Sequence, residues 1–92
     1  MELLSDTQVE EALASLPGWQ RDGAALTCDL ECADFVDAIG FVNRVAELAE
    51  REGHHPDIEV HGYKRVRLTL STHSAGGLTE HDVKLARAIE AL

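Results

Sequence analysis

Three of the five histidines are placed so that folding would bring them together. His54 and His55 stand between a long helical pattern and a strand-like stretch at residues 57–60, and His73 follows a strand-like stretch at 65–72. The short reversal between these stretches makes them hairpin partners, so the three histidines should gather at the end of the sheet opposite the turn. An imidazole gains and loses a proton near neutral pH. The spacing therefore predicts a general acid–base site.

Three further side chains are candidates for the same site. Glu50 precedes His54 by four residues and reaches the same place if the helix continues that far. Asp82 is either a site residue or only the last member of the capping box Thr79-x-x-Asp82. Trp19 is either a platform for a planar ligand or a core residue. The histidines also have a simpler interpretation, as a polar connection between a helix and a strand.

Neither a metal site nor a nucleophilic site is predicted. Zinc ligands usually come in close pairs, whereas adjacent histidines point in different directions. Cys28 and Cys32 do not pair with a histidine at ligand spacing, and we expect both to be free thiols in a reducing compartment. The chain has no Gly-x-Ser-x-Gly elbow.

The composition limits the classes of partner. The 92 residues suit one domain, residues 1–92, which is small enough to gain stability from association. Seventeen acidic against eight basic residues give a formal charge of −9, which disfavours direct binding of nucleic acid or anionic lipid. The longest uncharged apolar run, residues 38–42, is far shorter than the ~20 residues that span a membrane. With no signal peptide visible at residues 1–8, we expect a cytoplasmic protein.

Helical periodicity appears in three places. Residues 5–16 open with a Ser5-x-x-Gln8 capping box, and a last helix begins at Thr79. The segment 33–51 carries two apolar stripes: Phe35, Ile39, Val42, Ala46 and Ala49, and beside them Phe41, Val45 and Leu48. This apolar surface is wider than one sheet face needs, so it predicts a subunit contact.

Four strand-like stretches complete the pattern. Residues 19–21 and 24–31 flank Asp22-Gly23, which we expect to form a two-residue type I′ turn. Residues 57–60 and 65–72 form the second hairpin. The order α-β-β-α-β-β-α predicts an α+β fold, with an antiparallel four-stranded sheet and helices packed on one face.

The spacing of the candidate residues matches that of a known family. Six positions carry the match: Glu50, His54 and His55 before Pro56, Tyr63, His73 and Asp82. They closely resemble the signature of the pterin-4a-carbinolamine dehydratases, also called 4a-hydroxytetrahydrobiopterin dehydratases. The resemblance covers nearly the whole chain, from Leu-Pro-Gly-Trp at 16–19 to Gly-Leu-Thr-Glu-His-Asp at 77–82.

The resemblance implies an enzyme of tetrahydrobiopterin recycling. Members of this family remove water from 4a-hydroxytetrahydropterin to give quinonoid dihydropterin, without a metal or an organic cofactor. The resemblance implies proton transfer by His54 and His73, in roles that stay open. It implies that His55 orients the pterin and that Glu50 supports a histidine or a ring N–H.

The resemblance also implies which partners to expect. Trp19 and Asp82 join Glu50 as expected substrate contacts. The partners are then a small pterin and further copies of the chain, because family members form homodimers or homotetramers through the long helix or the sheet edge.

Two other interpretations compete with catalysis. Some family members act as dimerisation cofactors of transcription factors, and degenerate relatives serve in Rubisco assembly, so the chain can be a binding module on the same fold. A pure scaffold has no need of the histidines, which favours the enzyme. A metal-binding protein, the third interpretation, predicts bound zinc or nickel in purified material.

Overall fold

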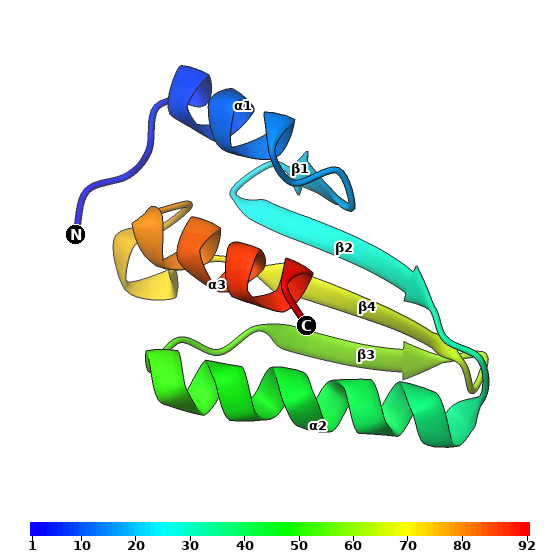
Figure 1. Cartoon of the computed structure of the whole chain (residues 1–92). Helices are drawn as coiled ribbons and strands as arrows, with labels where there is room; N and C mark the ends of the chain where they lie inside the picture. Colours follow the sequence, from blue (N-terminus) through cyan, green and yellow to red (C-terminus); the bar gives the residue numbers. More distant parts are fainter.

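Three helices and four strands make up the chain. The computed structural model describes residues 1–92 (Figure 1). In chain order its elements are α1 (Asp6–Ala14), β1 (Trp19–Asp22), β2 (Ala25–Glu31), α2 (Phe35–Glu52), β3 (Asp57–His61), β4 (Arg65–Leu70), the short 3-10 helix η1 (His73–Ala75) and α3 (Glu80–Glu90). The predicted order is confirmed. The last strand was expected to continue to residue 72, but β4 ends at Leu70, and the η1 turn that follows was not predicted.

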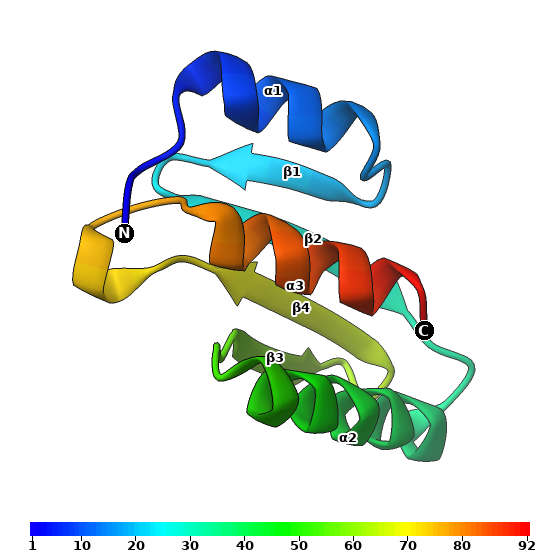
Figure 2. The same cartoon turned by 60° about the vertical axis from the view of Figure 1, so that its left-hand side comes forward.

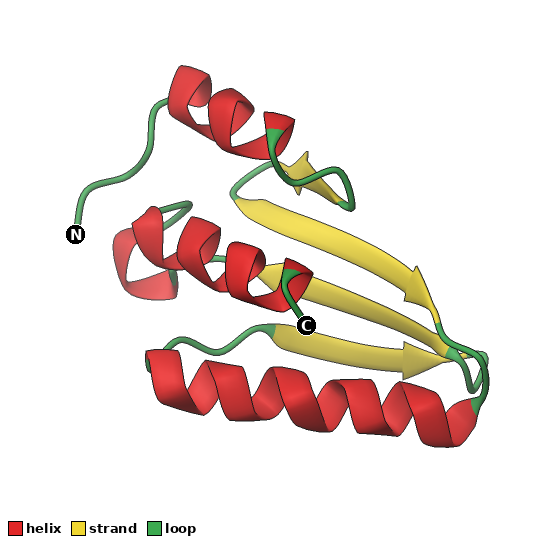
Figure 3. Ribbon diagram, viewed as in Figure 1, coloured by secondary structure: helices red, strands yellow, loops and turns green.

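The strands form one antiparallel sheet in the order β1-β2-β4-β3. The two hairpins therefore join through their second strands, and β1 and β3 lie at the edges. All three helices lie on the same side of this sheet (Figures 2 and 3). Alternation along the strands sends the apolar side chains to that side, where Leu26, Val66, Leu68 and Leu70 are at most 1% exposed. The structure thus confirms the α+β fold with one covered face.

The face that α2 buries differs from the main stripe that periodicity predicted. Ala38 and Val45 are fully buried, whereas Phe35 and Ile39 are 53% and 37% exposed. The two predicted stripes adjoin on the helix, and contact with the sheet selects the one that passes through Val45. The exposed side also carries Val36 at 79% exposure. We call Phe35, Val36 and Ile39 the α2 apolar patch.

The turn of the first hairpin lies one residue later than expected. Asp22 pairs with Ala25, so the two central residues are Gly23 and Ala24. Gly23 has a φ of +59°, and Ala24 does not adopt a positive φ. A type I′ turn needs positive φ at both central positions, whereas a type II′ turn needs it only at the first. The turn is therefore of the II′ kind, and glycine at its first central position accounts for it.

The capping box predicted at the start of the first helix is confirmed. The Ser5 hydroxyl accepts from the Gln8 backbone and the Gln8 side chain accepts from the Ser5 backbone, at 3.1 and 2.8 Å, so α1 begins with the predicted capping box.

No helix of this chain combines the length and the apolar character needed to cross a bilayer.

Candidate functional site

His54 and Asp82 meet where the end of α2 approaches the start of α3 (Figure 1). Gly53, with a φ of +65°, ends α2, and the His54 N–H donates to the carbonyl of Ala49 at 3.1 Å. This closure requires a left-handed residue, which explains the glycine. The turn brings Nε2 of His54 to 2.6 Å from Oδ1 of Asp82. The His54 side chain is 14% exposed and Asp82 is fully buried, so the pair is held inside the fold with one edge of the imidazole near the surface.

Asp82 accepts three hydrogen bonds. The Thr79 N–H donates to Oδ2 at 2.9 Å, which confirms the predicted capping box. The Thr72 hydroxyl donates to the same oxygen at 2.8 Å. His54 supplies the third bond, to Oδ1. With Asp82 ionised, its carboxylate only accepts hydrogen bonds, so Nε2 of His54 is the donor and Nδ1 is the ring nitrogen without a partner in the chain.

The burial of Asp82 favours one of its two predicted roles over the other. Its carboxylate has no exposed surface, so a ligand outside the fold meets His54 first. The structure therefore supports a role in capping and in holding His54. It offers no support for direct contact between Asp82 and a substrate.

Glu50 and His55 form a second pair on the surface. The helix continues through Glu52, as the prediction for Glu50 required, and the Glu50 carboxylate contacts Nε2 of His55 instead of His54. The two side chains are 76% and 63% exposed, so water competes for both. This pair is open to solvent, whereas the pair of His54 and Asp82 is buried.

His73 lies in η1, beside the same network. It directly follows Thr72, whose hydroxyl binds Asp82, so the backbone places it close to the carboxylate that holds His54. Its side chain is exposed and is free to meet a ligand. The structure thus brings His54, His55 and His73 to the end of the sheet opposite the β3–β4 turn, as the hairpin pattern predicted.

Sequence reasoning missed two residues of this region. His81 stacks on His54 with ring centroids 5.6 Å apart and planes at 30°. It also lines a hollow of about 370 Å³ together with Met1, Glu80, Lys84 and Arg87. Thr72 was not predicted as a site residue, although it directly precedes His73 in the stretch Leu-Ser-Thr-His at 70–73.

Trp19 is a core residue. It is 5% exposed and packs in the main apolar cluster, and its indole N–H has no acceptor within the chain. It presents no open face on which a planar ligand can stack. The predicted alternative of a core tryptophan fits the structure, and the geometry offers no support for Trp19 as a substrate contact.

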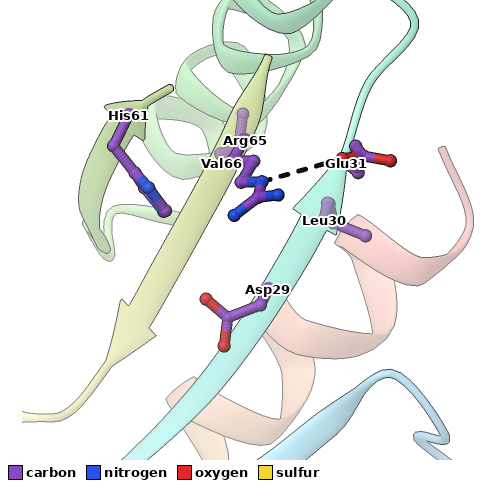
Figure 4. Close-up of a pocket in the computed structure, with 6 residues that line it drawn as sticks. All are labelled: Asp29, Leu30, Glu31, His61, Arg65 and Val66. Carbon is purple, nitrogen blue, oxygen red and sulfur yellow. Dashed lines mark ion pairs between the residues drawn. The ribbon is translucent and has the colours of Figure 1, made fainter. Parts of the chain in front are cut away.

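A second hollow, of about 330 Å³, lies at the opposite end of the sheet (Figure 4). The polar side chains that line it come from the face without helices: Asp29, Glu31, His61 and Arg65. Arg65 approaches Glu31 to 3.6 Å, with both side chains about 60% exposed. The charges here are already paired and solvated, so this hollow lacks the buried, oriented groups of the histidine end.

The side chains give little support for a metal site or for a nucleophilic cysteine. No three His, Cys, Asp or Glu residues lie close enough together to hold a metal ion. Cys28 is buried, and burial, followed by the charges of Glu90 and Asp29, raises the pKa of its thiol to about 11. A nucleophilic cysteine needs the thiolate, so Cys28 is inert at neutral pH.

Comparison with known proteins decides the family. A family model described as pterin 4 alpha carbinolamine dehydratase matches residues 2–92. The chain belongs to this family. A relative from Acidobacterium capsulatum, named "Putative pterin-4-alpha-carbinolamine dehydratase", is 53% identical over 92 residues, covering 100% of this chain and 99% of its own. A relative of the same name from Nocardia farcinica is 53% identical over 91 residues, covering 99% and 95%.

Solved structures of the family share the fold. The crystal structure of a transcriptional coactivator/pterin dehydratase from Brucella melitensis matches with a TM-score of 0.91 and 40% identity, over 98% of this chain and 97% of that one. A pterin dehydratase-like protein identified as a RuBisCO assembly factor in the alpha-carboxysome matches with a TM-score of 0.66 and 25% identity, over 80% and 87%. The family fold is therefore found in proteins of more than one described role.

Proposed function

We propose that this protein dehydrates 4a-hydroxytetrahydropterin to quinonoid dihydropterin by histidine general acid–base catalysis, as a step in tetrahydrobiopterin recycling. The observation that carries the proposal is the buried bond from Nε2 of His54 to Asp82, 2.6 Å long, in a chain of the pterin dehydratase family. In acid–base sites a carboxylate that binds one ring nitrogen of a histidine fixes the tautomer and the orientation of the imidazole. The two free cysteines suit a reducing cytoplasm, where we propose that the enzyme acts.

The reaction calls for an acid and a base. The C4a–O bond breaks slowly if the oxygen must leave as hydroxide, so an acid that donates a proton to this oxygen lets it leave as water. A lone pair on a neighbouring ring nitrogen forms the new double bond, and a base accepts the proton from a ring N–H. One proton is given and one is taken, so the enzyme ends in its starting protonation state once the two groups re-equilibrate. Each positioned group typically contributes ~10²–10⁴-fold.

His54 and His73 are the proposed acid and base. His54 acts through Nδ1, because Asp82 occupies Nε2. His73 acts from the exposed η1 turn beside it. His55 orients the pterin, and the Glu50 carboxylate that contacts it fixes its ring. Only protons and water are exchanged, so the chemistry requires no redox group.

A dehydration assay tests the proposal. The protein should convert freshly generated 4a-hydroxytetrahydropterin well above the spontaneous rate, measured as the appearance of quinonoid dihydropterin in stopped-flow absorbance. Prior treatment with a chelator should leave the rate unchanged. A rate equal to the spontaneous one would overturn the proposal.

A binding or assembly role is the second candidate. The α2 apolar patch and the similarity to a RuBisCO assembly factor favour it. It predicts no rate enhancement and a partner-dependent function that survives loss of His54 and His73. The same assay therefore separates the two candidates.

We also propose that the chain works as a homodimer or homotetramer through the α2 apolar patch. Val36, at 79% exposure, is the most exposed of its three large apolar side chains. Val36→Glu should lower the mass measured by sedimentation equilibrium to that of a smaller assembly, because a charge cannot be buried unpaired. Leu92→Glu is the matched control, since Leu92 is 51% exposed at the C-terminus and should not affect the mass. A wild-type monomer at micromolar concentration would contradict this proposal.

A further inference from the structure

A chain of buried hydroxyl groups continues from Asp82 into the fold. The Thr72 hydroxyl donates to Oδ2 of Asp82 at 2.8 Å, and the Oγ1 atoms of Thr72 and Thr79 lie 2.7 Å apart. Thr72 is 6% exposed, and Thr79 and Asp82 are fully buried. A hydroxyl has a single proton, and Thr72 gives its proton to the carboxylate. Thr79 must therefore donate to Thr72, and the direction of donation is Thr79 to Thr72 to Asp82.

Helix capping does not explain the Thr72 hydroxyl. The capping box needs only Thr79 and Asp82, and it is complete without a third residue. Thr72 belongs to a different part of the chain, between β4 and η1. Its hydroxyl binds the Asp82 carboxylate that holds His54, and Thr72 itself directly precedes His73 in the chain. The bond thus connects the carboxylate that holds His54 with the chain neighbour of His73.

We propose that Thr72 is a positioning residue for His54. Its hydroxyl holds the Asp82 carboxylate in the orientation in which Oδ1 receives the Nε2 proton of His54, which keeps Nδ1 free. Without the hydroxyl, Oδ2 keeps only the Thr79 N–H, and a buried carboxylate that loses a donor turns toward other donors. The catalytic consequence rests on the proposed dehydratase function, whereas the effect on His54 does not.

Thr72→Val and Thr72→Ser form the central pair of variants. Valine keeps the β-branched shape that suits the extended backbone at Thr72, where φ is −100° and ψ is 93°, but it removes the hydroxyl. We expect Thr72→Val to lower kcat for dehydration by ~10-fold with little change in KM, as is typical of residues that act through a neighbour. Thr72→Ser keeps the hydroxyl and should restore most of the rate. Thr27→Val is the matched control, because Thr27 is 2% exposed on β2 and takes no part in this network.

The tautomer of His54 provides a readout that needs no substrate. Nitrogen-15 NMR shifts of the His54 ring, recorded from about pH 8 to 9 where an ordinary imidazole is neutral, should show the Nε2–H tautomer in the wild type, in Thr72→Ser and in Thr27→Val. Thr72→Val should show a mixture of the two tautomers. If Thr72→Val does not fold, Thr72→Ala takes its place and must show the same mixture.

The possible outcomes separate this inference from the proposed function. A wild type in the Nδ1–H tautomer, a Thr72→Val variant with the wild-type tautomer, or a Thr72→Ser variant as impaired as Thr72→Val would overturn the positioning role. A wild type without dehydratase activity would overturn the proposed function. The tautomer shift in Thr72→Val would still support the positioning role in that case.

Discussion

Alanine in place of His54 or His73 is expected to lower kcat for dehydration by ~10²–10⁴-fold in each variant. Either change leaves one of the two proton transfers to water, which is neither positioned nor tuned for the task. His73 is exposed, and Asp82 keeps the donors Thr72 Oγ1 and Thr79 N–H when the largely buried His54 side chain is removed, so both variants should keep the wild-type far-UV circular dichroism. Stopped-flow dehydration rates on folded protein measure the effect.

The pH profile of the same variants assigns the acid and the base. A wild-type enzyme with one acid and one base should give a bell-shaped kcat/KM profile. Loss of the acid removes the alkaline limb, because activity no longer depends on a group that must be protonated. Loss of the base removes the acidic limb for the opposite reason. The variant of His54 and the variant of His73 should each lose a different limb.

His61→Ala is the matched control for these two variants. His61 is an exposed histidine at the far end of β3, beside the second hollow. Its loss should leave the rate and the pH profile unchanged. A His73→Ala variant that retains the wild-type rate would show that the second proton-transfer group lies elsewhere.

Asp82→Asn is expected to lower kcat by ~10²–10⁴-fold while the protein stays folded. The amide oxygen can still accept from Thr72 and from the Thr79 backbone, which preserves the cap. The amide NH₂ group then faces His54 and donates to Nε2, so the imidazole proton moves to Nδ1. As a base, His54 then has no free lone pair on Nδ1, and as an acid it has lost the carboxylate that stabilises its imidazolium. The dehydration rate and the nitrogen-15 shifts of His54 report the two consequences.

Two further variants separate catalysis from capping. Asp82→Ala removes the N3 half of the capping box as well as the partner of His54, and it leaves the buried donors of Thr72 and Thr79 without their acceptor, so it should also cost about 1–3 kcal/mol of stability in urea unfolding. Gln8→Ala weakens the corresponding capping box of α1 and should lower stability with no effect on kcat. An Asp82→Asn variant with wild-type kcat would refute the orienting role of Asp82.

Much of the local structure follows from short stretches of sequence. The capping boxes at Ser5 and Thr79, the glycine that ends α2 and the alternation of Val66, Leu68 and Leu70 each depend on residues within one or two turns of each other. The position predicted for the first turn was wrong by one residue. The sequence alone does not show whether Gly23 is the first or the second residue of a two-residue loop, because that depends on the strand register.

The sequence predicted which histidines lie near one another but not which side chains pair with them. The end-of-sheet placement of His54, His55 and His73 followed from hairpin symmetry. The spacing allowed Glu50 to meet either histidine, and the structure pairs it with His55. The stacking of His81 on His54 joins two elements that share no local pattern.

The sequence by itself thus determined the element order, the helix ends, the family and the group of histidines, because each depends on neighbouring residues or on a spaced signature. Only the tertiary structure decided which face α2 buries, that β2 pairs with β4, and that Asp82 is shared by His54, Thr72 and Thr79. The physical reason is that these features join residues far apart in the sequence. A hydrogen bond across 28 residues exists only when packing brings its two ends together, and no periodicity or propensity along the chain records that distance.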